Sequence, residues 1–301
     1  REAMGAELER VARRCDGVRC DMAMLVLPEV FSRTWAAAPA PKGGVQNAPF
    51  WPDAIARARR AAPGFTFMAE VYWGLEAQLQ QQGFDYTYDK TLYDWLRNGD
   101  APGVRKHLGS PIEFQNRCAR FLENHDEPRS ATSFPHPMQP AAAAITFLAP
   151  GLRFFHEGQF QGRRVKLPVQ LGRRPEEAIN EGLLEFYRKM VGVLRRPEVR
   201  EGTWSLLSCR PAWDGNPTWE RFITMRWELG DKRILVAVNF GGTQGQCYVL
   251  DPLPAMRGRQ VRLQDLTAPP SYDRSGDEMA TKGLYLDLPP WGFHVFEVKP
   301  L

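Results

Sequence analysis

The chain has 301 residues, of which 43% are hydrophobic and 25% charged, proportions that exclude a disordered, collagen-like or disulfide-stapled chain. Its 39 Lys and Arg residues exceed its 35 Asp and Glu residues only slightly and are scattered in ones and twos, so a nucleic-acid partner is not expected. No apolar run reaches the roughly 18 residues of a membrane span, so no membrane partner is expected either.

Strand and helix signals alternate through the first 200 residues. The apolar spacing of Met4, Leu8 and Val11 predicts that the chain opens with an amphipathic helix. The expected strands are residues 17–27, 65–71, 83–88, 119–123 and 152–155. The expected further helices are residues 52–62, 90–96, 112–118, 140–148 and 177–194, and residues 34–50 are expected to form an inserted loop.

Such alternation builds a parallel sheet with helical crossovers, either a doubly wound sheet or a (β/α)8 TIM barrel. No GxGxxG or Walker loop follows an expected strand, which favours the barrel. Beyond residue 200 the pattern changes to short strands separated by turns, at residues 222–229, 234–240, 246–250, 260–263, 284–288 and 293–298. We therefore predict two domains, part of a barrel in residues 1–200 and an antiparallel β-sandwich in residues 201–301.

Five cysteines without a CxxC spacing predict free, buried thiols, not disulfides or a zinc site. They are Cys15, Cys20, Cys118, Cys209 and Cys247. Free thiols indicate a reducing compartment, so the predicted location is the cytoplasm.

Acidic residues stand at the ends of three expected strands, namely Asp21, Glu70 and Asp126. Because the C-terminal strand ends of a barrel surround its pocket, these carboxyl groups are expected to converge although they are far apart in the sequence. Arg19 lies two residues before Asp21, on the same face of the strand, where a guanidinium keeps a carboxylate ionised as a nucleophile requires.

Glu70 has no such cation beside it in the sequence. It precedes the aromatic residues Tyr72 and Trp73, and a carboxyl group beside aromatic rings can stay protonated and act as an acid. A carboxylate nucleophile and a carboxylic acid on one pocket are the groups that retaining glycoside hydrolysis needs.

Residues 17–21, 67–73 and 121–128 resemble, in this order, conserved regions two, three and four of the α-amylase superfamily, glycoside hydrolase family 13. Residues 150–158 resemble the eighth strand of that family and the loop after it, and the predicted β-sandwich resembles its C-terminal domain. The resemblance covers nearly the whole chain.

The resemblance implies roles for single residues. Asp21 would be the nucleophile that forms a covalent glycosyl-enzyme, with Arg19 orienting it, and Glu70 would be the general acid/base. Asp126 would bind sugar hydroxyls and favour the oxocarbenium-like transition state, and His125 would hydrogen-bond the same sugar ring.

Two departures from the family pattern carry consequences. The first conserved region has no counterpart, so the resemblance implies that the chain is the C-terminal part of such an enzyme, with about strands four to eight of the barrel. We expect residues 1–301 alone to hydrolyse little or nothing. Met24 and Leu25 stand where many α-amylases have Lys-His, which leaves acceptor-side specificity and a calcium site open; no other cofactor is expected.

The predicted function is a retaining glycosidase acting on the α-glucosidic bonds of α-glucans or maltooligosaccharides. One alternative is transglycosylation, as in trehalose-forming or glucan-transferring relatives. The alternative of another class is a non-catalytic scaffold similar to amino-acid transporter heavy chains, which the three carboxyl groups disfavour because scaffolds usually lose them. The oligomeric state is not predicted.

Other residues suit structural roles. Cys20 points away from the expected nucleophile and is expected to be a packed thiol. Tyr72 and Trp73 are expected either to stack on sugar rings or to pack in the core. No metal-ligand companions stand at a suitable spacing from His107, His136 and His294, so no metal site is predicted.

Overall fold

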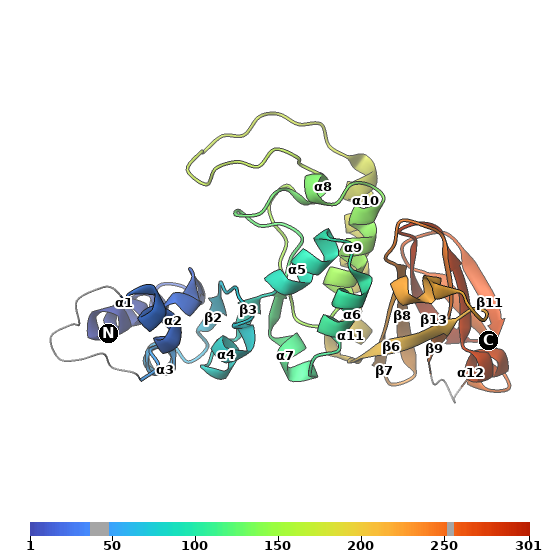
Figure 1. The fold of residues 1–301 in the computed structure, drawn as a ribbon, viewed down its shortest axis with the longest axis horizontal. Coiled ribbons are helices and arrows are strands. Elements are labelled where there is room, and N and C mark those ends of the chain that lie inside the picture. Colours follow the sequence, from blue (N-terminus) through green and yellow to red (C-terminus); the bar gives the residue numbers. More distant parts are fainter. Residues whose placement is uncertain (37–47, 252–255) are drawn as a thin grey trace. The chain divides into compact units, whose positions relative to one another are not determined.

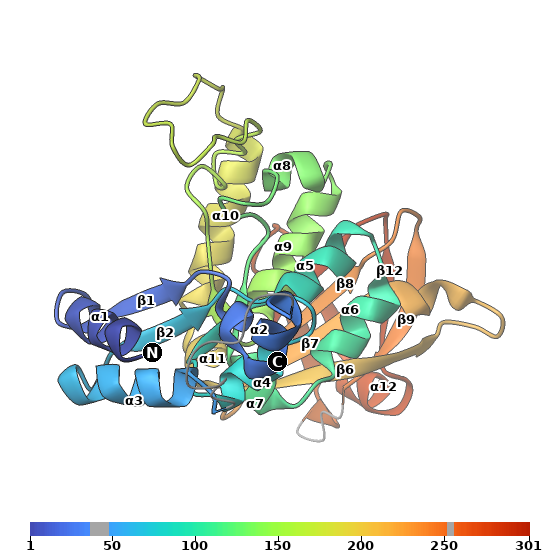
Figure 2. The same ribbon diagram turned by 60° about the vertical axis from the view of Figure 1, so that its left-hand side comes forward.

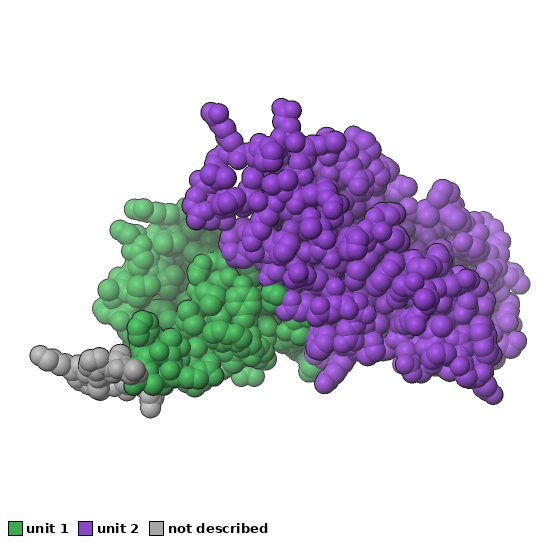
Figure 3. Space-filling model, turned by 45° about the horizontal axis from the view of Figure 1, so that its top comes forward, with its two compact units in different colours: residues 1–91, 111–120 green, residues 92–110, 121–301 purple. Residues whose placement is uncertain are grey.

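The computed structural model describes residues 1–36, 48–251 and 256–301. The chain forms two compact units, coloured separately in Figure 3. Unit 1 comprises residues 1–91 and 111–120, and unit 2 comprises residues 92–110 and 121–301. Most of the expected inserted loop at 34–50 lies outside the described residues, and the predicted domain boundary at residue 200 stays a prediction.

Unit 1 is built on a parallel sheet. Its strands run in the order β1 (Gly17–Cys20), β2 (Thr66–Ala69), β3 (Tyr86–Tyr88) and β4 (Cys118–Arg120). Its helices are α1 (Glu2–Ala12), η1 (Ala23–Val26), α2 (Pro28–Thr34), α3 (Trp51–Ala61), α4 (Glu76–Gln81) and α7 (Ile112–Asn116), and α5 (Lys90–Arg97) begins at its end. Figure 1 shows these elements in blue to green. Parallel strands joined by helices are the predicted arrangement.

Aromatic side chains fill the core of unit 1. Phe67 on β2 is fully buried, and its ring contacts Phe65 and Phe84 edge to face, with ring centroids 5.2 and 6.1 Å apart. Trp51, at the start of α3, contacts Phe84 in the same way at 4.7 Å. These contacts join the sheet to the helix that covers it, and burying such rings is the main favourable term for a layer of this kind.

The strands of unit 1 are shorter than the sequence predicts. Residues 17–27 were expected to form one strand, but β1 ends at Cys20, because Met22 adopts a left-handed backbone conformation with φ of 42° and the chain then enters η1. Residues 119–123 were expected as a strand, and β4 covers Cys118–Arg120. Strand β2 likewise ends at Ala69, one residue before Glu70.

Unit 2 begins with helices. These are α6 (Ala101–Leu108), α8 (Ser130–Ser133), α9 (Met138–Leu148), α10 (Glu181–Leu194) and α11 (Pro197–Glu201), with the short strand β5 (Leu152–Arg153) after α9. Helix α9 is buried at every position except Pro140, including four consecutive alanines, and lies between α10 and β8 (Lys232–Asn239) (Figures 1 and 2). Helix α10 begins at Glu181, later than predicted, because the side chain of Asn180 caps it by accepting from the Leu183 amide.

The C-terminal residues form an antiparallel, curled sheet of eight strands. Its order is β11 (Ser271–Ser275), β10 (Gln260–Asp265), β13 (Phe293–Pro300), β8, β7 (Phe222–Leu229), β6 (Thr203–Pro211), β9 (Gly245–Leu250) and β12 (Leu284–Leu288). The described residues here also form η2 (Pro217–Arg221) and α12 (Gly276–Lys282). Strand β6 pairs with β7 through its first half and with β9 through its second half, so one strand joins both parts of the sheet. The antiparallel pairing of these strands was predicted correctly, whereas their division into the two sheets of a sandwich stays a prediction.

Candidate active site

The first two predicted carboxyl groups leave the sheet of unit 1 side by side. Strands β1 and β2 are parallel neighbours, with Cys20 opposite Ala69. The amide of Glu70 donates to the carbonyl of Cys20 at 2.9 Å, so the ladder continues up to the residue after each strand. Asp21 and Glu70 therefore follow the C-terminal ends of adjacent strands, the edge of a parallel sheet where ligands bind.

Arg19 bridges the two carboxylates. Its Nη1 lies 2.6 Å from Oδ2 of Asp21, and its Nη2 lies 2.9 Å from Oε1 of Glu70. The guanidinium also lies 5.6 Å from the ring centre of Tyr88, within range of a cation–π contact. The expectation that Glu70 lacks a close cation was wrong, because Arg19 reaches across to the neighbouring strand as well as along its own.

Glu70 is held from three sides, whereas Asp21 is open to solvent. Besides the contact with Arg19, Glu70 accepts from the Met22 amide at 2.6 Å and from the Tyr72 hydroxyl at 2.8 Å. Its side chain is 5% exposed, and that of Asp21 is 79% exposed. The Glu70 carboxylate is thus fixed in position, whereas the Asp21 carboxylate is accessible to a ligand.

The two aromatic residues after Glu70 differ in environment. Tyr72 is partly buried against the core of unit 1, and its hydroxyl donates a hydrogen bond to Glu70. Trp73 is 61% exposed, so the core-packing alternative is wrong for it. Its backbone is left-handed, with φ of 65°, a conformation that is strained for a tryptophan and that turns the chain directly after the site.

The cysteines of this unit divide by exposure. Burial raises the pKa of the Cys20 thiol to about 12, which confirms the prediction of a packed thiol. Cys15 is exposed, so the prediction that all five thiols are buried was wrong. All five are free cysteines.

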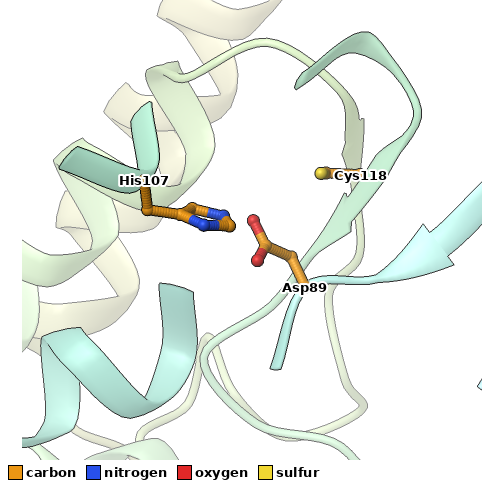
Figure 4. A group of neighbouring side chains, drawn as sticks. All are labelled: Asp89, His107 and Cys118. Carbon is orange, nitrogen blue, oxygen red and sulfur yellow. The ribbon is translucent and has the colours of Figure 1, made fainter. Parts of the chain in front are cut away.

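Asp89 and Cys118 are further groups of unit 1 that could bind a ligand, and Figure 4 shows them with His107, which belongs to unit 2. The Asp89 carboxylate accepts from Arg120, and both side chains are almost fully buried. Burial, together with the charge of Asp89, raises the pKa of the Cys118 thiol well above its usual range. Cys118 therefore stays a thiol, which excludes it as a nucleophile near neutral pH.

The third predicted carboxyl group belongs to unit 2. Asp126 and His125 contact each other, with Oδ2 3.0 Å from Nε2, and both side chains are partly exposed. They lie in a turn that the Asn124 side chain holds, because its Oδ1 accepts from the amides of Asp126 and Glu127 at 2.9 and 2.8 Å. The Lys166 ammonium donates to the carbonyl oxygen of Asp126.

The structure thus brings the predicted residues together in two sets. Unit 1 holds Arg19, Asp21, Glu70, Tyr72 and Trp73, and unit 2 holds His125 and Asp126.

Sequence reasoning missed the buried carboxylate of Glu123 and its partner Arg129, and it missed Lys166. Glu123 was predicted only as the last residue of the strand 119–123. Its signal was a charged residue inside a run that is otherwise buried, since a buried charge must have a partner.

Comparison with solved structures places the fold. A maltogenic α-amylase from Thermotoga neapolitana matches 100% of this chain with a TM-score of 0.68 and 17% identity. An α-amylase from Geobacillus thermoleovorans, solved with acarbose, matches 99% with a TM-score of 0.70 and 15% identity. A debranching enzyme from Nostoc punctiforme matches 98% with a TM-score of 0.63 and 17% identity.

The chain has the fold of α-amylase-type enzymes. It spans 65%, 63% and 60% of the lengths of these three proteins. No family model and no curated sequence matches the chain. No helix of the described residues is long and apolar enough to cross a bilayer.

Proposed function

We propose that the intact protein is a glycosidase of the α-amylase family that cleaves α-glucosidic bonds with retention of configuration. In this proposal Asp21 attacks the anomeric carbon and forms the glycosyl-enzyme. Glu70 first protonates the leaving oxygen and then activates water. Asp126 and His125 bind hydroxyls of the same sugar.

The observation that carries the proposal is the pair of carboxylates bridged by Arg19 at the ends of two adjacent parallel strands. Two carboxyl groups at one strand-end edge are what retaining hydrolysis requires. The unequal exposure of the two supports unequal roles, because a nucleophile must reach the sugar whereas an acid/base must keep one orientation. The α-amylase fold supports the α-glucosidic substrate class by analogy only.

Replacement of Asp21 by Asn in the intact protein tests this proposal. We expect turnover of maltooligosaccharides to fall at least about 10³-fold, because the nucleophile is lost while the shape is kept. Asp16→Asn is the matched control, since Asp16 is an exposed residue just before the same strand. Equal activity of both variants would refute the proposed role of Asp21.

Product analysis separates hydrolysis from transglycosylation. Hydrolysis releases reducing ends in proportion to bonds cleaved, whereas transfer forms new glucosides and releases fewer. We propose hydrolysis. New glucosides as the main product at low acceptor concentration would replace it by the transferase alternative, and failure of wild-type protein to bind acarbose in calorimetry would favour the scaffold.

A further inference from the structure

Glu123 is a fully buried carboxylate three residues before Asp126. Its Oε1 lies 2.9 Å from Nη1 of Arg129, and the side chains of the two residues are 0% and 6% exposed. Its Oε2 accepts from both the amide and the hydroxyl of Ser130, each at 2.6 Å. A charge without water needs such a set of donors, and here both oxygens of the carboxylate have partners.

These contacts join the two ends of a short loop. Residues 124–128 lie between Glu123 on one side and Arg129 and Ser130 on the other, and they include His125 and Asp126. The carboxylate therefore ties the two ends of the loop together. Within the loop, Asn124 accepts from two amides, including that of Asp126, so the exposed residues sit on a turn fixed both inside and at its base.

The contacts of Glu123 with Arg129 and Ser130, which we call the clamp, are anchored to the rest of unit 2. Ser130 accepts from the Gln139 side chain on α9 at 2.9 Å. Arg129 donates from Nη2 to the carbonyl of Glu157 at 2.7 Å, and its Nη1 lies 2.7 Å from Nδ1 of His156. Nδ1 of His156 also lies 3.2 Å from Oε1 of Glu123, so this ring nitrogen contacts both members of the ion pair.

Gly158 shows how tightly the guanidinium is enclosed. Its φ is +84°, and a Cβ at this position would overlap Nη2 of Arg129. A side chain is excluded there on both counts, backbone strain and space. Gly158 thus leaves the space that the Arg129 guanidinium occupies.

We propose that Glu123 is a positioning residue of the glycosidase site, which acts through Arg129 and Ser130 to hold the loop that carries His125 and Asp126. The proposal rests on the proposed function, because an effect on turnover requires Asp126 to act on the substrate. Glu123 does not touch the substrate. It keeps the Asp126 carboxylate in the geometry at which transition-state contacts form.

The test compares Glu123→Gln with Glu198→Gln in the intact protein. Glu198 is a matched control, since it is also buried in unit 2 and paired with an arginine, Arg196, at 3.0 Å. We expect Glu123→Gln to lower kcat by about 10- to 100-fold with little change in KM, because the loop loses its transition-state geometry. Glu198→Gln should cost stability without changing kcat.

Amide hydrogen exchange gives a second readout that does not depend on activity. In Glu123→Gln, a peptide covering residues 124–128 should exchange at least about tenfold faster, while the same peptide in Glu198→Gln should keep the wild-type rate. Glu123→Asp, which keeps the charge but is one methylene shorter, replaces Glu123→Gln if that variant fails to fold.

Equal kcat and equal exchange of this peptide in the Glu123 and Glu198 variants would overturn the positioning role. If the wild type cleaves no α-glucan, the proposed function fails. In that case faster exchange in the Glu123 variant would still establish the clamp and remove its role in turnover, and unchanged exchange would reject the clamp as well.

Discussion

Arg19 decides how the two carboxylates of unit 1 are arranged. One guanidinium contacts both Asp21 and Glu70 through different nitrogens. A lysine in its place would offer a single point charge on a flexible stem and could not hold both groups in one geometry. The bridging contact therefore depends on the planar fork of arginine.

We predict that Arg19→Lys lowers kcat/KM about 10- to 100-fold, because the two carboxylates lose their common orientation. The control is Arg10→Lys, since Arg10 makes an exposed ion pair with Glu7 on α1. Steady-state kinetics of both variants check the prediction. Wild-type kinetics for Arg19→Lys would show that the bridge is not needed for turnover.

The thiols of unit 1 give a prediction of pH dependence. Alkylation requires the thiolate, so exposed Cys15 should react with iodoacetamide at pH 8, whereas Cys20, with a pKa of about 12, should not. The raised pKa means that the folded chain keeps the proton. The protonated Cys20 thiol therefore contributes fully to the free energy of unfolding below the ordinary thiol pKa of about 8.5. This contribution is lost as pH rises towards 12.

Mass spectrometry of the alkylated peptides checks this prediction. Labelling of Cys20 at pH 8 at the rate of Cys15, under conditions where the protein is folded, would contradict it.

At the scale of residues, the sequence predicted contacts along a strand but not between strands. The period of two placed Arg19 beside Asp21 correctly. The contact of Arg19 with Glu70 crosses to another strand, and the clamp from Glu123 to Arg129 crosses a loop without periodicity. In neither case does the sequence indicate which residue is the partner, so both contacts were found only in the structure.

At the scale of elements, apolar runs located most strands but not their ends. Residues 17–27 are apolar beyond β1 because η1 also faces the core, so hydrophobicity alone does not separate strand from 3-10 helix. Strands β6 and β11 were missed. β6 lacks a regular alternation because it serves two partner strands, and β11 is largely polar because it is an edge strand.

Two glycines of unit 2 predict opposite effects of the same substitution. A Cβ on Gly202, between α11 and β6, would overlap the carbonyl oxygens of Glu198 and Glu228, whereas Gly192 on α10 has open space around it. We predict that Gly202→Ala lowers the free energy of unfolding by about 1–3 kcal/mol. Gly192→Ala should raise it by about 0.5–1 kcal/mol, because alanine restricts the unfolded chain.

Chemical denaturation of both variants measures these changes. A Gly202→Ala variant as stable as the wild type would mean that the backbone can move away from the added methyl group, contrary to the close approach seen here.

At the scale of the whole molecule, the α-amylase fold was predicted from three short segments and is confirmed by the comparison with solved enzymes. Those enzymes differ in activity while sharing the fold, so the reaction has to be argued from the residues of the site. The expectation that residues 1–301 alone hydrolyse little stays a prediction. Robust turnover by this chain in purified form would contradict it.

The most direct test of the whole account is to trap the sugar on the enzyme. In the intact protein with Glu70→Gln, α-glucosyl fluoride can still react, because fluoride leaves without an acid, but water is no longer activated for the second step. We predict a covalent glucosyl adduct that peptide mass spectrometry locates on Asp21 and that is absent when Asp21 is also replaced by Asn. An adduct on another residue, or one that persists in the double variant, would contradict the account.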